Sequence, residues 1–360
     1  TYSFNKKAYL TREFPKNNLT FSYFNDIISP FDKFLPTDKD NMFLAFHASK
    51  VDQFNHVNEY KVSYDREWEN GMKFYSSFTR TGSKPVDALF YQPWGTGTIC
   101  SDGVGRPSMD NKSSWVGKMN TSELKASISF EPGATYVNTK QRRLKINLDA
   151  PVYTVSHTWG IKGFLGGDYD YHVTEAGIYK RFWLGSWGKI DTDVKAGIQW
   201  SKVPFPLLIH PAANQSYILE DFTFNLINSL EFLNDRYASL MLSWDISGKI
   251  FNRIPLLKKL KWREFIGVNM LWGTLTDKNN PAKSNYSDGE LFYFPGHFNK
   301  DGVYESNTYV MDPNTPYVEL RMGIHNIFKL VHVEYIRRLT YLNHPDINKD
   351  GFRFMVRVTF

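Results

Sequence analysis

Residues 352–360, Phe-Arg-Phe-Met-Val-Arg-Val-Thr-Phe, alternate between two kinds of side chain from end to end. One face would carry Phe352, Phe354, Val356, Val358 and Phe360. The other would carry Arg353, Met355, Arg357 and Thr359. Because successive side chains of a β-strand point to opposite faces, this pattern predicts a strand with one apolar face and one largely polar face.

The same alternation recurs upstream, at residues 61–65, 143–148, 239–246, 318–325 and 331–336. No helix of ordinary length is indicated, because the one stretch with helical spacing, 254–260, contains Pro255. The sequence therefore predicts an all-β chain of about sixteen strands, with approximate boundaries. They are expected at 2–13, 18–28, 41–50, 57–68, 71–82, 124–131, 140–149, 152–164, 168–182, 186–200, 217–230, 236–250, 261–274, 316–325, 329–340 and 351–360.

The connections between these strands alternate along the chain between one rim, where some are long, and the other, where some are tight. Residues 83–123 and 275–315 form long connections rich in Gly, Pro, Asn, Ser and Asp, whereas those at 69–71 and 325–326 are tight. Long loops on one rim and short turns on the other are typical of outer-membrane β-barrels, and a strand of about 9–11 residues crosses a bilayer. The Pro-rich stretch 203–216 falls on the short-turn side in this count.

Composition excludes several classes of protein. The 28 Phe, 21 Tyr and 10 Trp make up 16% of the 360 residues, which excludes a disordered chain. A disulfide scaffold is excluded because Cys100 has no second cysteine with which to pair. No apolar run approaches 18 residues, so a bundle of membrane helices is excluded. The net charge of +6 comes without a Lys/Arg block, so no nucleic-acid partner is expected.

Alternation alone leaves a soluble double β-sandwich, such as a lectin, as an alternative. Long strands and aromatic residues near strand ends favour a transmembrane antiparallel up-and-down barrel. These aromatic residues are Tyr153, Phe182, Trp183, Trp187, Trp262 and Trp272. The chain also ends on an aromatic residue in register with the apolar face. Phe360, with Val358 and Phe354, is therefore interpreted as an outer-membrane targeting signal.

The polar faces of the strands predict the lining of the barrel. They carry both signs of charge, which suits an interior filled by water or by salt-bridged plug segments. The residues expected there are Asp168, Asp170, His172, Arg321, Glu334, Arg353 and Arg357. After the Gly166-Gly167 turn, Asp168, Asp170 and His172 would share one strand face. A metal or acid–base cluster is the alternative interpretation of these three residues, and a polar lumen face is favoured.

No motif predicts a catalytic, cofactor-binding or metal-binding residue. Residues 346–351, Asp-Ile-Asn-Lys-Asp-Gly, fit the first half of a calcium loop, but Arg357 stands where a bidentate Glu is required. A turn is therefore predicted there, with a calcium ion as the alternative. Residues 185–188, Gly-Ser-Trp-Gly, lack the spacing of a nucleophile elbow. Enzyme activity is not expected, although a barrel hydrolase remains an alternative.

Five stretches resemble a Bacteroidota outer-membrane β-barrel family of unknown function. They are GFLGGDYDYH (163–172), VPFPLLIHPAANQSYI (203–218), FNLINSLEFLNDRY (224–237), NRIPLLKKLKWRE (252–264) and GIHNIFKLVHVEYIRRL (323–339). Members usually carry a carboxypeptidase-regulatory-like domain before the barrel. The resemblance implies that residues 1–360 form a single barrel domain in the bacterial outer membrane, without that amino-terminal domain.

A fainter resemblance is to the Omp85 superfamily, which folds or translocates proteins at the outer membrane. It depends on residues 229–232, on 243–248 and on the order of the last three strands. The chain has no Arg-Gly pair like the one in the lumen loop of those barrels, and Gln215-Ser216-Tyr217 is the nearest stretch. The POTRA domains of that superfamily are also not in this sequence.

These observations predict a non-enzymatic integral outer-membrane barrel without cofactors. We expect it to be a subunit of an outer-membrane protein assembly or transport complex, and a passive diffusion pore is the main alternative. The expected partners are outer-membrane lipid, including lipopolysaccharide, and other envelope proteins such as complex subunits and lipoproteins.

Overall fold

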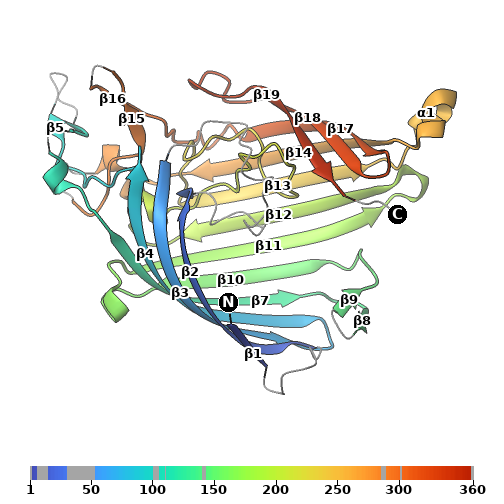
Figure 1. Ribbon diagram of the computed structural model, residues 1–360, viewed down its shortest axis with the longest axis horizontal. Coiled ribbons are helices and arrows are strands. Elements are labelled where there is room, and N and C mark those ends of the chain that lie inside the picture. The colour runs from blue at the N-terminus through green and yellow to red at the C-terminus, as the bar shows by residue number, and fades with distance from the viewer. Residues whose placement is uncertain are drawn as a thin grey trace.

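The computed structural model describes residues 2–5, 15–30, 53–99, 105–109, 111–139, 143–284, 289–300 and 302–357. Thirteen strands form one antiparallel sheet, and their order in the sheet follows their order in the chain. They are β1 (Tyr2–Asn5), β2 (Asn17–Ile28), β3 (Gln53–Glu67), β4 (Met72–Asp87), β7 (Met119–Phe130), β10 (Val152–Gly160), β11 (Tyr171–Trp183), β12 (Lys189–Gln199), β13 (Arg236–Asp245), β14 (Arg263–Thr274), β17 (Tyr317–Ile327), β18 (Val331–Arg338) and β19 (Asp350–Val356). The sheet is strongly curved, as the wall of a barrel (Figure 1).

The remaining elements are short. Three two-stranded sheets pair β5 (Thr98–Ile99) with β6 (Gly105–Arg106), β8 (Tyr136–Asn138) with β9 (Arg143–Lys145), and β15 (Gly296–Phe298) with β16 (Tyr304–Ser306). Helix α1 spans Pro255–Leu260, and 3-10 turns lie at Lys112–Ser114, Phe164–Gly166, Gly185–Trp187, Phe205–Leu207, Phe251–Arg253, Asp277–Asn279 and Pro281–Lys283. In the part of the chain that is described, no helix has the length and apolar character needed to span a membrane.

Two rims follow from the strand register. The short-turn rim carries connections 68–71, 131–151, 184–188, 246–262 and 328–330, since Lys189 pairs with Asp245 and Arg263 with His325. The long-loop rim carries 88–118, 161–170, 200–235, 275–316 and 339–349. The connections predicted to be long, near 88–118 and 275–316, lie on one rim, and the tight turns at 68–71 and 328–330 lie on the other, as the sequence predicts. The contrast is not complete, because 131–151 and 246–262 on the short-turn rim are longer than 161–170. Segment 200–235 lies on the long-loop rim, so the expected placement of 203–216 was wrong.

That error has a local cause. Residues 217–230 form no strand of the sheet, and of 140–149 only Arg143–Lys145 is a strand, in the small β8–β9 sheet. The expected strand at 41–50 lies outside the described residues. Thirteen of the sixteen predicted strands therefore correspond to strands of the described sheet. Removing the false strand at 140–149, which precedes 203–216, moves that stretch to the long-loop rim.

The two faces of the sheet differ as the alternation predicts. In β19, Arg353 and Met355 are buried, whereas Phe352, Phe354 and Val356 are exposed. The same holds in β14, where Asn269 and Leu271 point inward and are buried while Ile266 and Trp272 are exposed on the outer face. An apolar outer face and a polar inner face are the arrangement of a transmembrane barrel.

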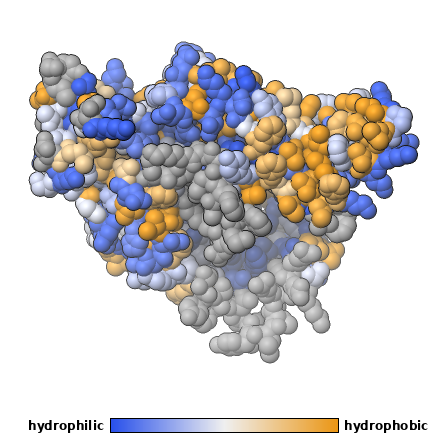
Figure 2. Space-filling view, turned by 45° about the horizontal axis from the view of Figure 1, so that its top comes forward, coloured by the Kyte–Doolittle hydropathy of each residue, from blue (hydrophilic) through white to orange (hydrophobic). Residues whose placement is uncertain are grey.

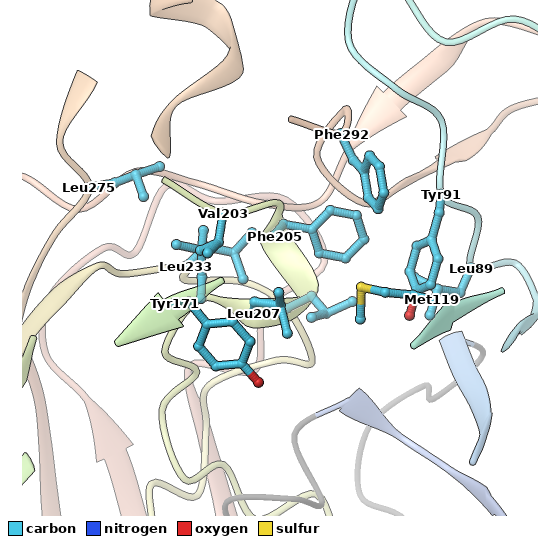
Figure 3. Close-up of a cluster of buried hydrophobic side chains, with 12 residues drawn as sticks. Leu89, Tyr91, Met119, Tyr171, Val203, Phe205, Leu207, Leu233, Leu275 and Phe292 are labelled. Atoms are coloured by element: carbon cyan, nitrogen blue, oxygen red, sulfur yellow. The ribbon is translucent and has the colours of Figure 1, made fainter. Parts of the chain in front are cut away.

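Long loops pack against one another over the interior at their rim. Tyr91 of connection 88–118 stacks on Phe292 of connection 275–316, with ring centroids 5.6 Å apart, and its hydroxyl donates to Asn55 Oδ1 of β3 at 2.6 Å. Phe205 packs against both rings (Figure 3). This apolar cluster joins connections 88–118 and 275–316 to segment 200–235, so that segment is held at the mouth of the barrel.

Candidate functional site: a plugged lumen

Residues 203–235, here called the plug segment, lie inside the curve of the sheet between β12 and β13, in yellow-green in Figure 1. The segment doubles back on itself, because Ile209 and Asn234 exchange backbone hydrogen bonds of 2.9 and 3.1 Å. Most of its apolar side chains, including Phe224, Phe232 and Leu233, are almost fully buried. Burial of both its faces explains why the stretch is rich in apolar residues without being a strand of the wall.

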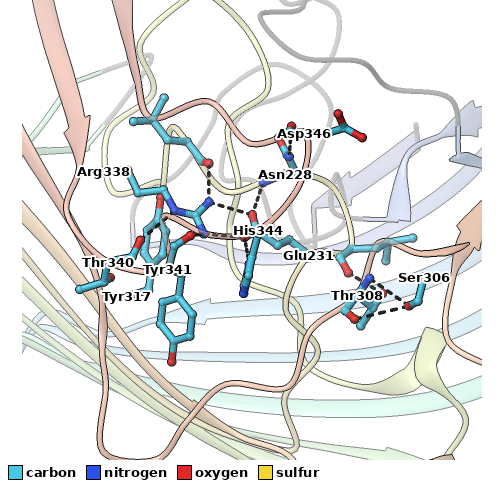
Figure 4. Close-up of polar contacts among 12 residues, drawn as sticks. Asn228, Glu231, Ser306, Thr308, Tyr317, Arg338, Thr340, Tyr341, His344 and Asp346 are labelled. Carbon is cyan, nitrogen blue, oxygen red and sulfur yellow. Dashed lines mark hydrogen bonds and ion pairs between the residues drawn. The ribbon is translucent and has the colours of Figure 1, made fainter.

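A buried ion pair anchors the plug segment to β18. Glu231 of the plug accepts hydrogen bonds from Arg338 Nη2 at 2.6 Å and Nη1 at 3.1 Å (Figure 4). The same carboxylate accepts from the backbone N–H of Asn228 at 3.0 Å and contacts His344 Nδ1 at 2.9 Å. Both side chains of the pair are at most 1% exposed. Burying the two charges costs desolvation free energy, but removing one partner would leave the other charge buried and unpaired, which is strongly destabilising. The pair therefore fixes the plug in one position.

A second carboxylate, Glu319 of β17, receives the plug's backbone. Its oxygens accept from the N–H groups of Asn225 at 3.0 Å and Leu226 at 2.7 Å. The hydroxyl of Tyr317 donates to the same carboxylate at 2.6 Å. Arg353 of β19 donates to the carbonyl oxygen of Asn225. Three wall strands, β17, β18 and β19, therefore bind the tip of the plug.

The plug segment also pairs with the edge of the sheet. Leu219 N donates to Phe354 O at 2.7 Å and Phe354 N donates to Tyr217 O at 2.9 Å, which makes a parallel bridge between Ile218 and Phe354. β19 is the last strand in the order of the sheet, and its other edge pairs with β18. Residues 217–219 therefore cover part of the outer edge of β19.

A cavity of about 970 Å³ remains between the plug and the other half of the wall. Its lining includes charged side chains of both signs on the inner faces of β3, β7, β11 and β12. They are Glu59, Lys61, Glu123, Lys125, Glu175, Asp193 and Lys195. Several of them are paired, since Lys195 lies 3.0 Å from Asp193 and Tyr237 donates to Glu175 at 3.1 Å. The lining is therefore polar and carries charges of both signs.

Four predicted lumen residues lie on β17–β19 or just after them. Arg321 and Glu334 form a buried ion pair of 2.7 Å on the inner wall, and Arg353 contacts the plug. Arg357 is different: it is exposed and pairs with Asp221 of the plug segment at 2.7 Å. The structure thus brings Arg321 and Glu334 together. It places Arg357 directly after β19, where the plug segment meets the edge of the sheet.

The other three predicted lumen residues do not face the lumen. Tyr171 and Val173 of β11 line the cavity, so His172 between them points to the outer face. There its Nδ1 lies 3.3 Å from Nε2 of His157, and its ring stacks on Trp159. Asp170 is exposed and accepts from Trp159 Nε1 at 3.2 Å. Asp168, also exposed, accepts from Asn120 N at 2.7 Å. Within the described ranges, no group of three or more His, Cys, Asp and Glu side chains is placed to hold a metal ion.

The proposed targeting residues are only partly described. Phe354 lies on the exposed outer face of β19. Val358 and Phe360 fall outside the described residues.

The anchoring pair Glu231–Arg338 was missed by the sequence reasoning. Arg338 continues the polar face of the strand predicted at 329–340, so alternation could have found it. Glu231 follows the false strand at 217–230 and carries no periodic signal.

Acidification is expected to release the plug. Burial raises the pKa of Glu231, but hydrogen bonds from His344 and Arg338 outweigh it, so the pKa lies below its ordinary value. The ionised carboxylate therefore stabilises the folded, plugged state. This stabilisation is fully present above the pKa of about 4.3 that a glutamate has in the unfolded chain, and it is lost as pH falls through the lower pKa of Glu231 in the folded protein. Single-barrel currents in planar bilayers should therefore stay low from pH 7 to about 4 and rise below it.

The matched control for this titration is the double variant Glu231→Met/Arg338→Met, which removes both partners and should show no such step. A current that already rises near pH 6 would assign the release to histidine instead of Glu231.

Comparison with known proteins adds a family and a fold. The model of the family of unknown function DUF5686, C-terminal domain, matches residues 10–281. No curated protein matches the chain. Among solved structures, BamA from Haemophilus ducreyi lacking POTRA domains 1-3 is similar, with a TM-score of 0.54 at 10% sequence identity. The likeness covers 95% of this chain and 59% of the BamA chain. It confirms the all-β transmembrane barrel fold.

Proposed function

Because the chain belongs to the DUF5686 C-terminal domain family, whose function is unknown, we propose a function from its plugged lumen and its covered sheet edge. We propose that the protein is an integral barrel of the bacterial outer membrane. It acts without enzyme activity, as a subunit of a complex that assembles or transports outer-membrane proteins. The resemblance to the Omp85 superfamily supports this class of function.

The pairing of residues 217–219 with β19 carries the proposal. The outer edge of a terminal strand presents N–H and C=O groups that can pair with another extended chain, and proteins usually protect such edges. Among the described residues, a bridge of two backbone hydrogen bonds at Phe354 provides the protection. An edge covered by a short internal segment is suited to exchange that segment for a strand of a client chain.

Placement in the outer membrane is supported by the outer face of the sheet. Apolar residues such as Ile128, Val155 and Ile178 are exposed along the middle of the strands. Trp159, Trp200 and Trp272 lie toward the long-loop rim, and Tyr153, Trp183 and Trp187 toward the short-turn rim. Aromatic residues near both ends of an apolar band are typical of an outer-membrane barrel, whose short turns face the periplasm.

A photo-crosslinking experiment tests the proposal. A photoreactive phenylalanine replaces one of two residues. The first is Val356, which is 75% exposed on the edge strand β19. The second is Ile266, which is exposed on β14, a strand with neighbours on both sides. In living cells we expect adducts with newly made outer-membrane proteins at position 356 and none at 266. Equal adducts at both positions, or adducts at neither, would contradict the proposal.

A disulfide gives a second control. In a Cys100→Ser background, Ile218→Cys with Phe354→Cys joins the two facing residues of the bridge. This link should abolish the adducts at 356, and a reducing agent should restore them. Steady large conductance steps from the wild-type barrel in planar bilayers would instead support the passive pore.

A further inference from the structure

Three neighbouring connections on the short-turn rim carry a concentrated positive charge. Residues 184–188, 246–262 and 328–330 join β11 to β12, β13 to β14 and β17 to β18. They contain six basic residues, Lys249, Arg253, Lys258, Lys259, Lys261 and Lys329, and no Asp or Glu. The whole chain has a net charge of +6, so an excess as large as that of the entire protein lies in these three short connections.

The same connections expose large apolar side chains. Phe328 is 84% exposed and Leu256 of α1 is 71% exposed. Others with exposed side chains are Leu184, Trp187, Ile250, Ile254, Leu260 and Leu330. Figure 2 shows apolar and strongly hydrophilic surface side by side at the end of the molecule where α1 lies. These three connections are here called the basic collar.

Hydrogen bonds join the collar into one structure. Lys249 Nζ donates to Ser186 Oγ at 2.9 Å and lies 5.5 Å from the ring centre of Trp187. Trp244 Nε1 donates to Trp187 O at 2.9 Å. On the other side, Asn326 Nδ2 donates to Lys261 O at 2.7 Å. These contacts hold the three connections next to one another, so their basic and apolar groups form one surface.

We propose that the basic collar lies in the membrane interface and binds the headgroups of anionic glycerophospholipids. Apolar side chains enter the acyl boundary while lysine and arginine stems carry their charges to the phosphate layer. Charge complementarity favours an anionic lipid, since each basic group near such a surface adds attraction. The collar is also continuous with the apolar outer face, because Ile266 and Met322 follow it on β14 and β17. The inference depends on the membrane location proposed above.

Spin labels test the position of the collar. In a Cys100→Ser background, a label at Leu256→Cys reports on the collar and one at Ile266→Cys reports on the outer face. In nanodiscs containing phosphatidylglycerol, we expect oxygen to relax both labels more than a water-soluble nickel chelate does. If only the label at 266 lies in lipid, the collar inference fails while the membrane location holds. If both labels lie in water, the proposed function fails as well.

Charge variants test the headgroup preference. The variant Arg253→Gln/Lys258→Gln/Lys259→Gln/Lys261→Gln is compared with Lys112→Gln/Lys118→Gln/Lys162→Gln/Lys300→Gln, which neutralises four exposed lysines on the long-loop rim. Phosphatidylglycerol is titrated onto each full-length barrel in detergent, with phosphatidylcholine as the reference lipid. The collar variant should lose the preference for phosphatidylglycerol by at least about tenfold, and the control should keep it.

Two results would overturn the inference. One is an equal loss in both charge variants, or no preference for phosphatidylglycerol in the wild type. The other is a label at Leu256→Cys that neither oxygen nor nickel reaches in native membranes, because that protection would indicate a protein partner over the collar.

Discussion

Arg338→Met should open the barrel to ions and lower its thermal stability. The substitution removes the cation that lies 2.6 Å from Glu231 and leaves that carboxylate almost fully buried. Breaking a buried pair from one side costs about 3–5 kcal/mol. Since Glu231 belongs to the plug and Arg338 to the wall, the substitution weakens the contact that holds the plug in place. Planar-bilayer currents and the melting temperature in detergent measure the two effects.

The neighbouring residue provides a matched control. Arg337 also pairs with a carboxylate, Asp350, at 3.1 Å, but both side chains are about half exposed on the outer side of β18. Exposed pairs contribute about 0–1 kcal/mol, so Arg337→Met should leave current and stability almost unchanged. Adding Glu231→Met to Arg338→Met should restore much of the stability, because no unpaired charge remains. If Arg337→Met and Arg338→Met behave alike, the pair does not hold the plug.

Glu319→Gln should release the tip of the plug. The carboxylate accepts the backbone N–H groups of Asn225 and Leu226 and the hydroxyl of Tyr317. An amide keeps only one acceptor oxygen and turns N–H groups toward these donors. Each buried donor left unsatisfied costs about 1–3 kcal/mol. The expected result is a lower melting temperature with steady channel currents in planar bilayers.

A second buried glutamate separates release of the plug from general loss of stability. Glu334 is as buried as Glu319, but its hydrogen bonds go to the wall residues Arg321 and His325. Glu334→Gln should therefore lower the melting temperature without opening a current. Channel opening in both variants would mean that current follows overall destabilisation rather than loss of the plug contact.

The strands could be predicted because their signal is local. In residues 352–356 the alternation is visible in the chain itself, and the structure places Arg353 inward and Phe354 outward as expected. The plug could not be predicted in this way. Residues 217–230 have apolar residues enough for a strand, but their burial comes from partners far along the chain, such as Glu319 and Arg353. Those contacts leave no periodic pattern in the sequence of the segment.

The lumen residues show a different difficulty. Alternation places Asp168, Asp170 and His172 on one strand face, but it does not say which face is inside. Tyr171 decides the question, since it lines the cavity and its hydroxyl donates to Glu123. An aromatic residue with a hydroxyl suits either face, so the sequence alone left the direction open.

The connectivity of the plug has a consequence for the order of folding. Its anchors lie far downstream: Asn225 to Glu319 spans 94 residues, Glu231 to Arg338 spans 107, and Asn225 to Arg353 spans 128. Strand pairs such as β3 with β4 need only a tight turn, and contacts of high sequence separation form late because loop closure must come first. A nascent chain that has reached only β14 therefore holds a plug without any of these anchors. The last three strands complete the sheet and supply all three of these anchors, so the plug reaches its final position only after they have formed.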